Sequence, residues 1–186
     1  MATTTTVAPE VLDKLFGDGV ERYELVDGQL QAKPMVSIAH GLMISWISTL
    51  LNQQIGEDLY VIADPLAKIR EDAWRRPDIA VLRAEDAAPW KYIMPGHWPL
   101  LCVEMVSPPK QTVEEMLKKC ELYHQQGVSY CWVIEPESRA AWTHHNGAGA
   151  KWVSESAGDV LDADRIGIQL GDLWRGLKNK RSSRVE

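Results

Sequence analysis

The segment Leu100–Val106 limits what this chain can fold into more than any other part of the sequence. It reads LLCVEMV, so a β-strand made from it would present apolar side chains on both faces. Strands of this kind lie in the middle of a sheet that is covered on both sides, as in α/β proteins. The exception is Glu104, because burying a carboxylate is costly unless the group is paired or bound to a metal. Glu104 could also lie at a strand end, where it would reach solvent or a lysine.

Sequence patterns on either side of this segment predict the other elements of an α/β fold. The predicted helices cover 9–16, 37–55 and 112–126, and the predicted strands cover 59–70 with a bend at Pro65, 76–82, 100–106 and 129–135. Asp27-Gly28 and Asn146-Gly147 predict β-hairpins, because tight turns need residues that tolerate positive φ. The chain after residue 153 is predicted to be irregular. A single mixed sheet with helices on its faces is the simplest arrangement of these elements.

The length and composition favour one soluble domain. The chain has 186 residues, of which 45% are hydrophobic and 25% charged, and domains usually contain ~100 to 200 residues. We expect a single domain over residues 8–174, a disordered N-terminus over 1–7 and a basic C-terminal tail over 175–186. The three cysteines show no CxxC spacing, which favours small buried thiols in a reducing compartment.

Location and partners are also constrained by composition. The sequence shows no signal peptide and no segment apolar enough to span a bilayer, so we expect a cytoplasmic protein without membrane contact. The formal net charge of −6 counts against nucleic-acid binding, which usually leaves a basic footprint. A local basic patch can still bind phosphate on an acidic protein, and acidic metal ligands themselves lower the net charge.

Asp78 is a second carboxylate at the edge of an apolar strand. It precedes Ile79–Leu82 and, taken alone, would be an ordinary strand-start residue that makes a local turn bond. Asp78 and Glu104 could converge across neighbouring strands, where their mutual repulsion would require a cation between them. A small number of hard oxygen ligands suits Mg²⁺ or Mn²⁺, which keep several waters and share other positions with phosphate. Together the two carboxylates predict a divalent metal site.

Lys119 is the candidate amine beside these carboxylates. Glu115, Lys119 and Tyr123 are spaced at i, i+4 and i+8 of the predicted helix, so they share one face. If that face packs on the sheet, the Lys119 amine lies toward Glu104. The alternative is a solvated Glu–Lys pair, which would contribute only ~0.3 to 0.5 kcal/mol. The adjacent Lys118 competes for the same role.

Several motifs occur in a fixed order along the chain. They are Tyr23–Leu30, Arg76–Ile79, Val103–Pro108, Lys119 with Tyr123, Gly127–Val128 and Tyr130–Pro136. From about Arg22 to His145, this ordered set resembles the Uma-two family of restriction endonuclease-like proteins, which belongs to the PD-(D/E)XK nuclease superfamily. The resemblance implies an α/β, restriction-endonuclease-like fold with a mixed central β-sheet flanked by helices and an N-terminal β-hairpin.

The resemblance also implies roles for individual residues. Asp78 and Glu104 would be ligands of Mg²⁺ or Mn²⁺, and Lys119 would be the catalytic lysine. Glu24, which its strand pattern alone would place on an exposed surface, would be an acidic catalytic residue near the metal. His40 matches a position where the family often has histidine, and it could equally be an ordinary histidine near a helix N-terminus.

This chain departs from the family pattern at two places. Pro109-Lys110 follows Ser107-Pro108, where the family usually has Ser-Thr, and Glu115 stands where it usually has Asp. The alignment there needs about one inserted residue. The choice of Lys119 over Lys118 therefore depends on Tyr123 and on the helix phase.

Three functional hypotheses follow from the sequence. The first is a metal-dependent endonuclease that hydrolyses nucleic-acid phosphodiester bonds, with DNA as the expected target and a homodimer as the expected assembly. The alternative is a non-catalytic dimeric module on the same fold that binds nucleic acid or protein, which the net charge of −6 favours. A weaker third hypothesis is acid–base hydrolysis by carboxylates without metal, as in glycosidases.

Overall fold

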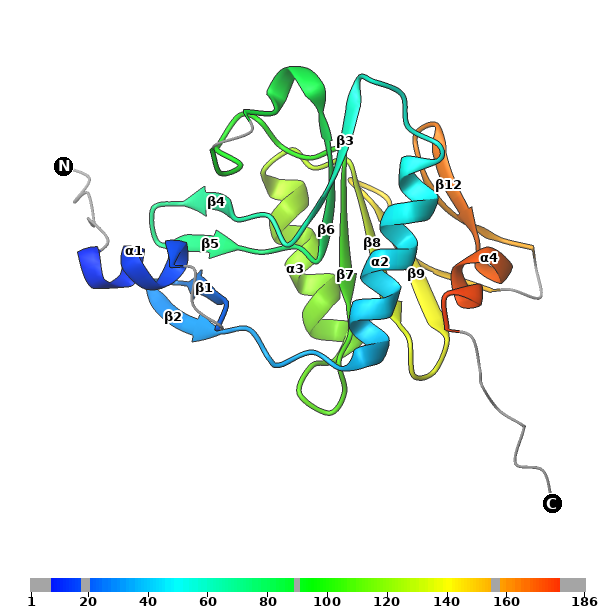
Figure 1. Cartoon of the computed structure of the whole chain (residues 1–186), viewed down its shortest axis with the longest axis horizontal. Helices are drawn as coiled ribbons and strands as arrows, with labels where there is room; N and C mark the ends of the chain where they lie inside the picture. The colour runs from blue at the N-terminus through cyan, green and yellow to red at the C-terminus, as the bar shows by residue number, and fades with distance from the viewer. Residues whose placement is uncertain (1–7, 18–20, 89–90, 155–157, 178–186) are drawn as a thin grey trace.

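A mixed six-stranded sheet forms the centre of the computed structural model, which describes residues 8–17, 21–88, 91–154 and 158–177 (Figure 1). Its strands are β3 (Leu59–Ala63), β6 (Ile79–Arg83), β7 (Leu101–Met105), β8 (Tyr130–Glu135), β9 (Ala140–His145) and β10 (Gly149–Val153). They lie in the order β10-β9-β8-β7-β6-β3. β7 pairs parallel with β8 and antiparallel with β6, and all five of its residues are buried. The predicted covered central strand is therefore confirmed.

Two helices cover the two faces of this sheet. Alternate residues of β7 contact them: Leu101, Val103 and Met105 belong to the hydrophobic cluster of α2 (Ile38–Asn52). Cys102 and Val106 belong to the cluster of α3 (Val113–Gln125). Because side chains of a strand alternate between its faces, Glu104 lies on the α3 side.

The starts of both helices follow from local sequence. The Ser37 side chain accepts a hydrogen bond from the backbone of His40 at the start of α2. Thr112 and Glu115 form a capping box at the start of α3, as their spacing predicts. Helix α2 ends at Asn52, three residues earlier than predicted.

A second sheet carries the N-terminal hairpin. It contains β1 (Tyr23–Val26), β2 (Gln29–Ala32), β4 (Ala67–Arg70) and β5 (Ala73–Arg75), in the order β2-β1-β5-β4. Asp27 and Gly28 adopt φ of 48° and 78°, which confirms the predicted tight turn. Helix α1 (Pro9–Phe16) packs on this sheet through Leu15.

The prediction of one strand over 59–70 and of a single sheet is wrong. Asp64 adopts φ of 50°, and Pro65 follows it without a backbone N–H. The chain turns there, so β3 and β4 join different sheets.

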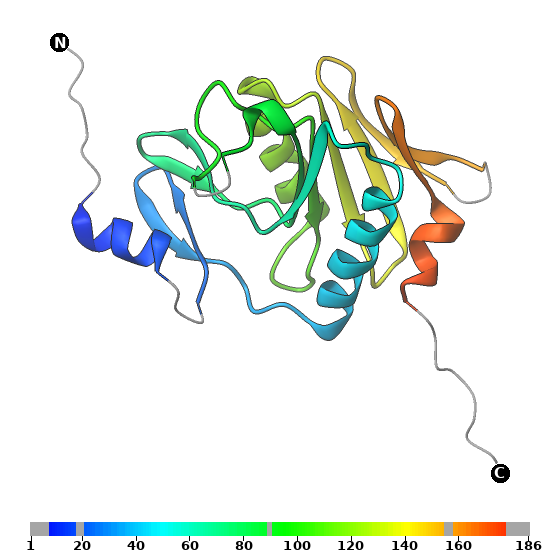
Figure 2. The same ribbon diagram turned by 45° about the horizontal axis from the view of Figure 1, so that its top comes forward.

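The prediction of an irregular C-terminal region is also wrong. The hairpin β11 (Val160–Ala163) and β12 (Ile166–Gln169) is followed by α4 (Leu170–Arg175). Residues of all three elements, including Leu161, Ile168 and Leu173, complete the core on the α2 face. Figure 2 shows these elements on one side of the central sheet and α1 with the N-terminal hairpin on the other.

The predictions for the two chain ends cannot be compared with the structure, whereas the prediction for the cysteines can. Residues 1–7, for which we expected disorder, lie outside the described part of the chain, and so do residues 178–186 of the expected basic tail. Cys102, Cys120 and Cys131 are buried and free, as predicted. None of the helices within the described ranges is long and apolar enough to cross a membrane.

Candidate active site

Asp78 and Glu104 meet where strands β6 and β7 lie side by side. The antiparallel register pairs Ile79 with Val103, and continuing it by one residue sets Asp78 opposite Glu104. The Asp78 Oδ2 atom accepts a hydrogen bond of 2.8 Å from the backbone N–H of Met105. Both carboxylates are buried, with exposed fractions of 4% and 2%. The structure thus brings together two acidic groups that are 26 positions apart in the numbering.

Lys119 reaches the same place from helix α3. Its Nζ atom lies 3.0 Å from Glu104 Oε1 and donates a hydrogen bond of 2.8 Å to Glu24 Oε1. Lys118, by contrast, is exposed and forms an ion pair of 2.7 Å with Glu114 one helical turn earlier. Successive helical residues point about 100° apart, so only one of the two lysines can face the sheet. Lys119 is the lysine that contacts the buried carboxylates.

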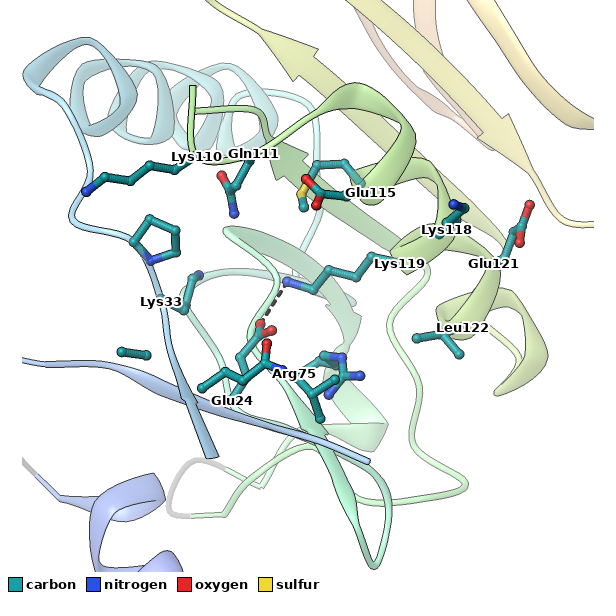
Figure 3. Close-up of a pocket in the computed structure, with 15 residues that line it drawn as sticks. Glu24, Lys33, Arg75, Lys110, Gln111, Glu115, Lys118, Lys119, Glu121 and Leu122 are labelled. Atoms are coloured by element: carbon teal, nitrogen blue, oxygen red, sulfur yellow. Dashed lines mark hydrogen bonds and ion pairs between the residues drawn. The ribbon is translucent and has the colours of Figure 1, made fainter. Parts of the chain in front are cut away.

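Glu24 enters from the N-terminal hairpin. Its Oε1 atom also accepts a hydrogen bond of 2.7 Å from the backbone N–H of Arg76, two residues before Asp78. The pairing of Leu25 in β1 with Trp74 in β5 holds the hairpin against this segment. Figure 3 shows Glu24 and Lys119 extending toward one another from the two sides of a cleft. The second sheet therefore contributes the Glu24 carboxylate to the site.

Tyr123 also lies at the site, one helical turn after Lys119. Its hydroxyl donates a hydrogen bond of 2.7 Å to Glu104 Oε1. The two residues of α3 thereby fix the Glu104 carboxylate from the same helix face, as the i, i+4 spacing requires.

Lys33 is a site residue that sequence reasoning missed. It follows β2, and its Nζ atom lies 3.0 Å from Asp78 Oδ1, 3.1 Å from Asp64 Oδ1 and 3.0 Å from the carbonyl oxygen of Arg76. Its side chain is 15% exposed. A lysine at the end of a hairpin strand looks like any solvated surface lysine, so the sequence offers no signal beyond its closeness to Glu24.

His40 belongs to the site as well. Its Nδ1 atom lies 2.9 Å from the Ser107 hydroxyl, and its Nε2 atom lies 3.5 Å from Asp78 Oδ1. Among the described residues, Nε2 is buried without a hydrogen-bond partner. The histidine of the family pattern is thus placed beside a predicted metal ligand.

A family model described as "Putative restriction endonuclease", Uma2, matches residues 12–171 of the chain. The chain belongs to the Uma2 (Uma-two) family. The match includes all the residues that meet at the site. Membership of the Uma2 family supports a nuclease function in general terms.

A solved structure agrees with this assignment at the level of the fold. The structure, titled "Crystal structure of a putative nuclease belonging to DUF820 from Anabaena variabilis ATCC 29413", is similar to this Uma2 chain with a TM-score of 0.72 and 17% sequence identity. The likeness covers 84% of this chain and 91% of that chain. It confirms the α/β, restriction-endonuclease-like fold. No curated protein matches the chain.

The two carboxylates of the Uma2 site differ in charge state. Burial raises the pKa of Glu104 to about 7, although the Lys119 ammonium opposes this shift. Burial alone would also raise the pKa of Asp78, but the neighbouring His40 imidazole and the Lys33 ammonium hold it well below its usual range. At neutral pH, Asp78 is therefore ionised, and Glu104 is divided between its protonated and ionised forms.

The Lys119 amine is held in its charged form. Burial alone would lower the pKa of Lys119, but the carboxylates of Glu104 and Glu24 raise it well above its usual value. Lys119 is consequently an ammonium at neutral pH. It can donate hydrogen bonds and supply positive charge, and it cannot accept a proton.

Glu24, Lys33 and Lys119 of the site line a cleft of about 590 Å³ between the hairpin and α3, whereas the buried Asp78 and Glu104 are not part of its lining (Figure 3). Five basic side chains line the cleft: Lys33, Arg75, Lys110, Lys118 and Lys119. The acidic side chains that line it are Glu24, Glu115 and Glu121. The lining is therefore locally basic although the Uma2 chain carries a net charge of −6. A smaller hollow of about 330 Å³ is lined by His40, Ser107 and Lys110 among others.

Proposed function

We propose that this Uma2 protein is a divalent-metal-dependent endonuclease that hydrolyses phosphodiester bonds of nucleic acid, with DNA as the substrate and Mg²⁺ or Mn²⁺ as the cofactor. One observation carries the proposal. The carboxylates of Asp78 and Glu104 lie buried on adjoining strands, with the Lys119 ammonium 3.0 Å from Glu104. A core does not gather such charges without a functional reason or strong pairing.

The donor set fits a hard divalent cation. Among the described residues, no group of three or more His, Cys, Asp and Glu side chains is arranged to hold a metal by itself. Mg²⁺ does not require such a group, because it takes one or two carboxylates and keeps several waters. The buried Nε2 atom of His40, which lies 3.5 Å from Asp78 Oδ1 and has no hydrogen bond among the described residues, is a further polar atom there. Asp78 and Glu104 would hold the ion.

A bound ion of this kind supplies Lewis-acid stabilisation of the phosphate and lowers the pKa of a bound water. Lys119 would contribute positive charge and hydrogen bonds where negative charge develops on the phosphate oxygens. Its raised pKa excludes it as the general base. Glu24 would position Lys119 through the 2.8 Å hydrogen bond, while the Arg76 backbone N–H holds the same Glu24 oxygen.

The cleft supports nucleic acid as the substrate class. Lys110 is exposed on its wall, and Lys33 and Lys119 lie deeper in it, whereas the Lys118 ammonium is paired with Glu114. Ammonium groups in the lining of a cleft attract a phosphate backbone even on an acidic protein. The first substrate to test is duplex DNA.

A homodimer is proposed from an apolar surface beside the site. Met35 and Ile38 are 88% and 84% exposed, and the neighbouring Val36 and Leu42 are also exposed. Large apolar side chains gathered on one segment commonly mark protein interfaces. Sedimentation equilibrium of wild type and of a Met35→Ser, Ile38→Ser double variant tests this. Identical monomer masses for both proteins would contradict the proposal.

The central experiment is cleavage of plasmid DNA with MgCl2 or MnCl2, compared with a chelator. Asp78→Asn, Glu104→Gln and Lys119→Met should abolish cleavage, and Lys118→Met should cleave like wild type. Thermal unfolding of each variant separates loss of chemistry from loss of fold. Cleavage by folded Asp78→Asn and Glu104→Gln proteins would show that the site lies elsewhere.

One observation favours the alternative, a non-catalytic module on the same fold. Lys33 and Lys119 already neutralise the two carboxylates without any metal. Calorimetric titration with MnCl2 discriminates, because an intact wild-type domain that binds no Mn²⁺ would support the module.

A further inference from the structure

We infer that Lys33 is a displaceable counter-ion of Asp78, whose ammonium occupies the carboxylate oxygen that a divalent cation would use. Binding of the cation then releases the ammonium into the cleft, where it can contact a phosphate of the substrate. The inference rests on the proposed function and concerns how occupancy of the same site is regulated.

The two oxygens of Asp78 have different partners. Oδ2 accepts the hydrogen bond from the Met105 backbone N–H and so ties β6 to β7. Oδ1 lies 3.0 Å from Lys33 Nζ and 3.5 Å from His40 Nε2. Oδ1 is therefore the oxygen that the Lys33 ammonium contacts, and a cation bound there would meet this ammonium.

A metal and this ammonium would compete for Oδ1 in the observed arrangement. Mg²⁺ lies about 2.1 Å from its ligand oxygens, and the ammonium is 3.0 Å from the same atom. A divalent and a monovalent cation held so close, in a partly buried site, repel one another strongly. This repulsion favours departure of one of them, and Lys33, which lines the cleft, is the one with room to move.

Lys33 can leave Asp78 without becoming an unpaired buried charge. Its Nζ atom also lies 3.1 Å from Asp64 Oδ1, and the Asp64 side chain is 34% exposed. Lys33 lines the cleft of about 590 Å³, so its flexible stem has an open side. Lys119 is more tightly held, because its second carboxylate, Glu24, is only 13% exposed and is itself fixed by the Arg76 backbone.

Calorimetric titration with MnCl2 tests the inference on the full chain. Lys33→Met should bind Mn²⁺ about tenfold more tightly than wild type or better, because one competing positive charge is gone, while DNA cleavage slows. Lys33→Gln, which keeps a hydrogen-bond donor without the charge, should show the same direction and guards against misfolding of the first variant. Lys118→Met, an exposed lysine of the same cleft, should leave the affinity unchanged. The gain should vanish in an Asp78→Asn background.

The outcomes separate this inference from the proposed function. If wild type binds Mn²⁺ and cleaves DNA but both Lys33 variants bind no more tightly, the inference fails and the proposed function stands. If the Lys33 variants bind Mn²⁺ and wild type does not, the inference is supported and the catalytic proposal fails. If none of the proteins binds Mn²⁺, both fail.

Discussion

Lowering the pH from 8 to 6 should weaken Mn²⁺ binding at this site about tenfold, because Glu104 must be ionised to act as a ligand. Burial against α3 raises the pKa of Glu104 to about 7, with Lys119 opposing the shift. Asp78 does not contribute to the change, since its pKa is held well below the usual range and it stays ionised. Asp78 therefore adds no pH dependence of its own in this range, and the His40→Gln control tests the imidazole beside it.

The magnitude follows from the titration of Glu104. A group with a pKa of about 7 is roughly 90% ionised at pH 8 and roughly 10% ionised at pH 6, which is about a tenfold change in competent protein and about 1.4 kcal/mol of binding free energy. The same reasoning predicts that binding at pH 6 releases roughly 0.9 protons, and at pH 8 roughly 0.1.

Isothermal titration with MnCl2 at pH 6, 7 and 8, in buffers of different ionisation enthalpy, measures both the affinity and the protons released. His40→Gln should keep the pH dependence, because the change comes from Glu104. In Glu104→Gln, whose amide does not ionise, residual binding should lose it. Equal affinity at pH 6 and pH 8 with no proton release would refute the assignment of Glu104 as a buried ligand.

Other predictions concern stability. Without metal, the free energy of unfolding should fall by about 3 kcal/mol between pH 5 and pH 8 in urea titrations, because Glu104 has a folded pKa raised to about 7 from 4.5; this contribution is present below the unfolded pKa and is lost as the pH rises through 7. Lys119→Met should lower the free energy of unfolding by about 3 to 5 kcal/mol, because it leaves Glu24 and Glu104 without their counter-charge. Lys118→Met should change it by no more than about 0.5 kcal/mol. Thr112→Ala removes the capping box of α3 and should cost about 1 kcal/mol by the same measurement.

Elements with strong local signals were predictable from the sequence. The α3 capping box, the Asp27-Gly28 turn and the buried strand at Leu101–Met105 depend on residues close together in the chain, and all three occur in the structure. Two predictions that depended on weaker local signals were wrong. The stretch 59–70 has strand-forming residues on both sides of Asp64-Pro65, yet the positive φ of Asp64 sends its two halves into separate sheets. The C-terminal hairpin was missed because its short strands gain their stability from packing on the core.

The features of the candidate site likewise separate into those that local sequence indicates and those that depend on tertiary contacts. The sequence alone indicated that Glu104 interrupts an apolar strand, that Asp78 precedes another apolar strand, and that Lys119 shares a helix face with Tyr123, because strand alternation and helix period are local properties. Only the tertiary structure decided that Lys119 rather than Lys118 faces the sheet, that Glu24 arrives from a second sheet, and that Lys33 and His40 close on Asp78. These contacts join residues up to 95 positions apart. They depend on the long-range packing of hairpin, helix and strands, and the free energy of bringing charges together in a low-dielectric interior is a property of that packing.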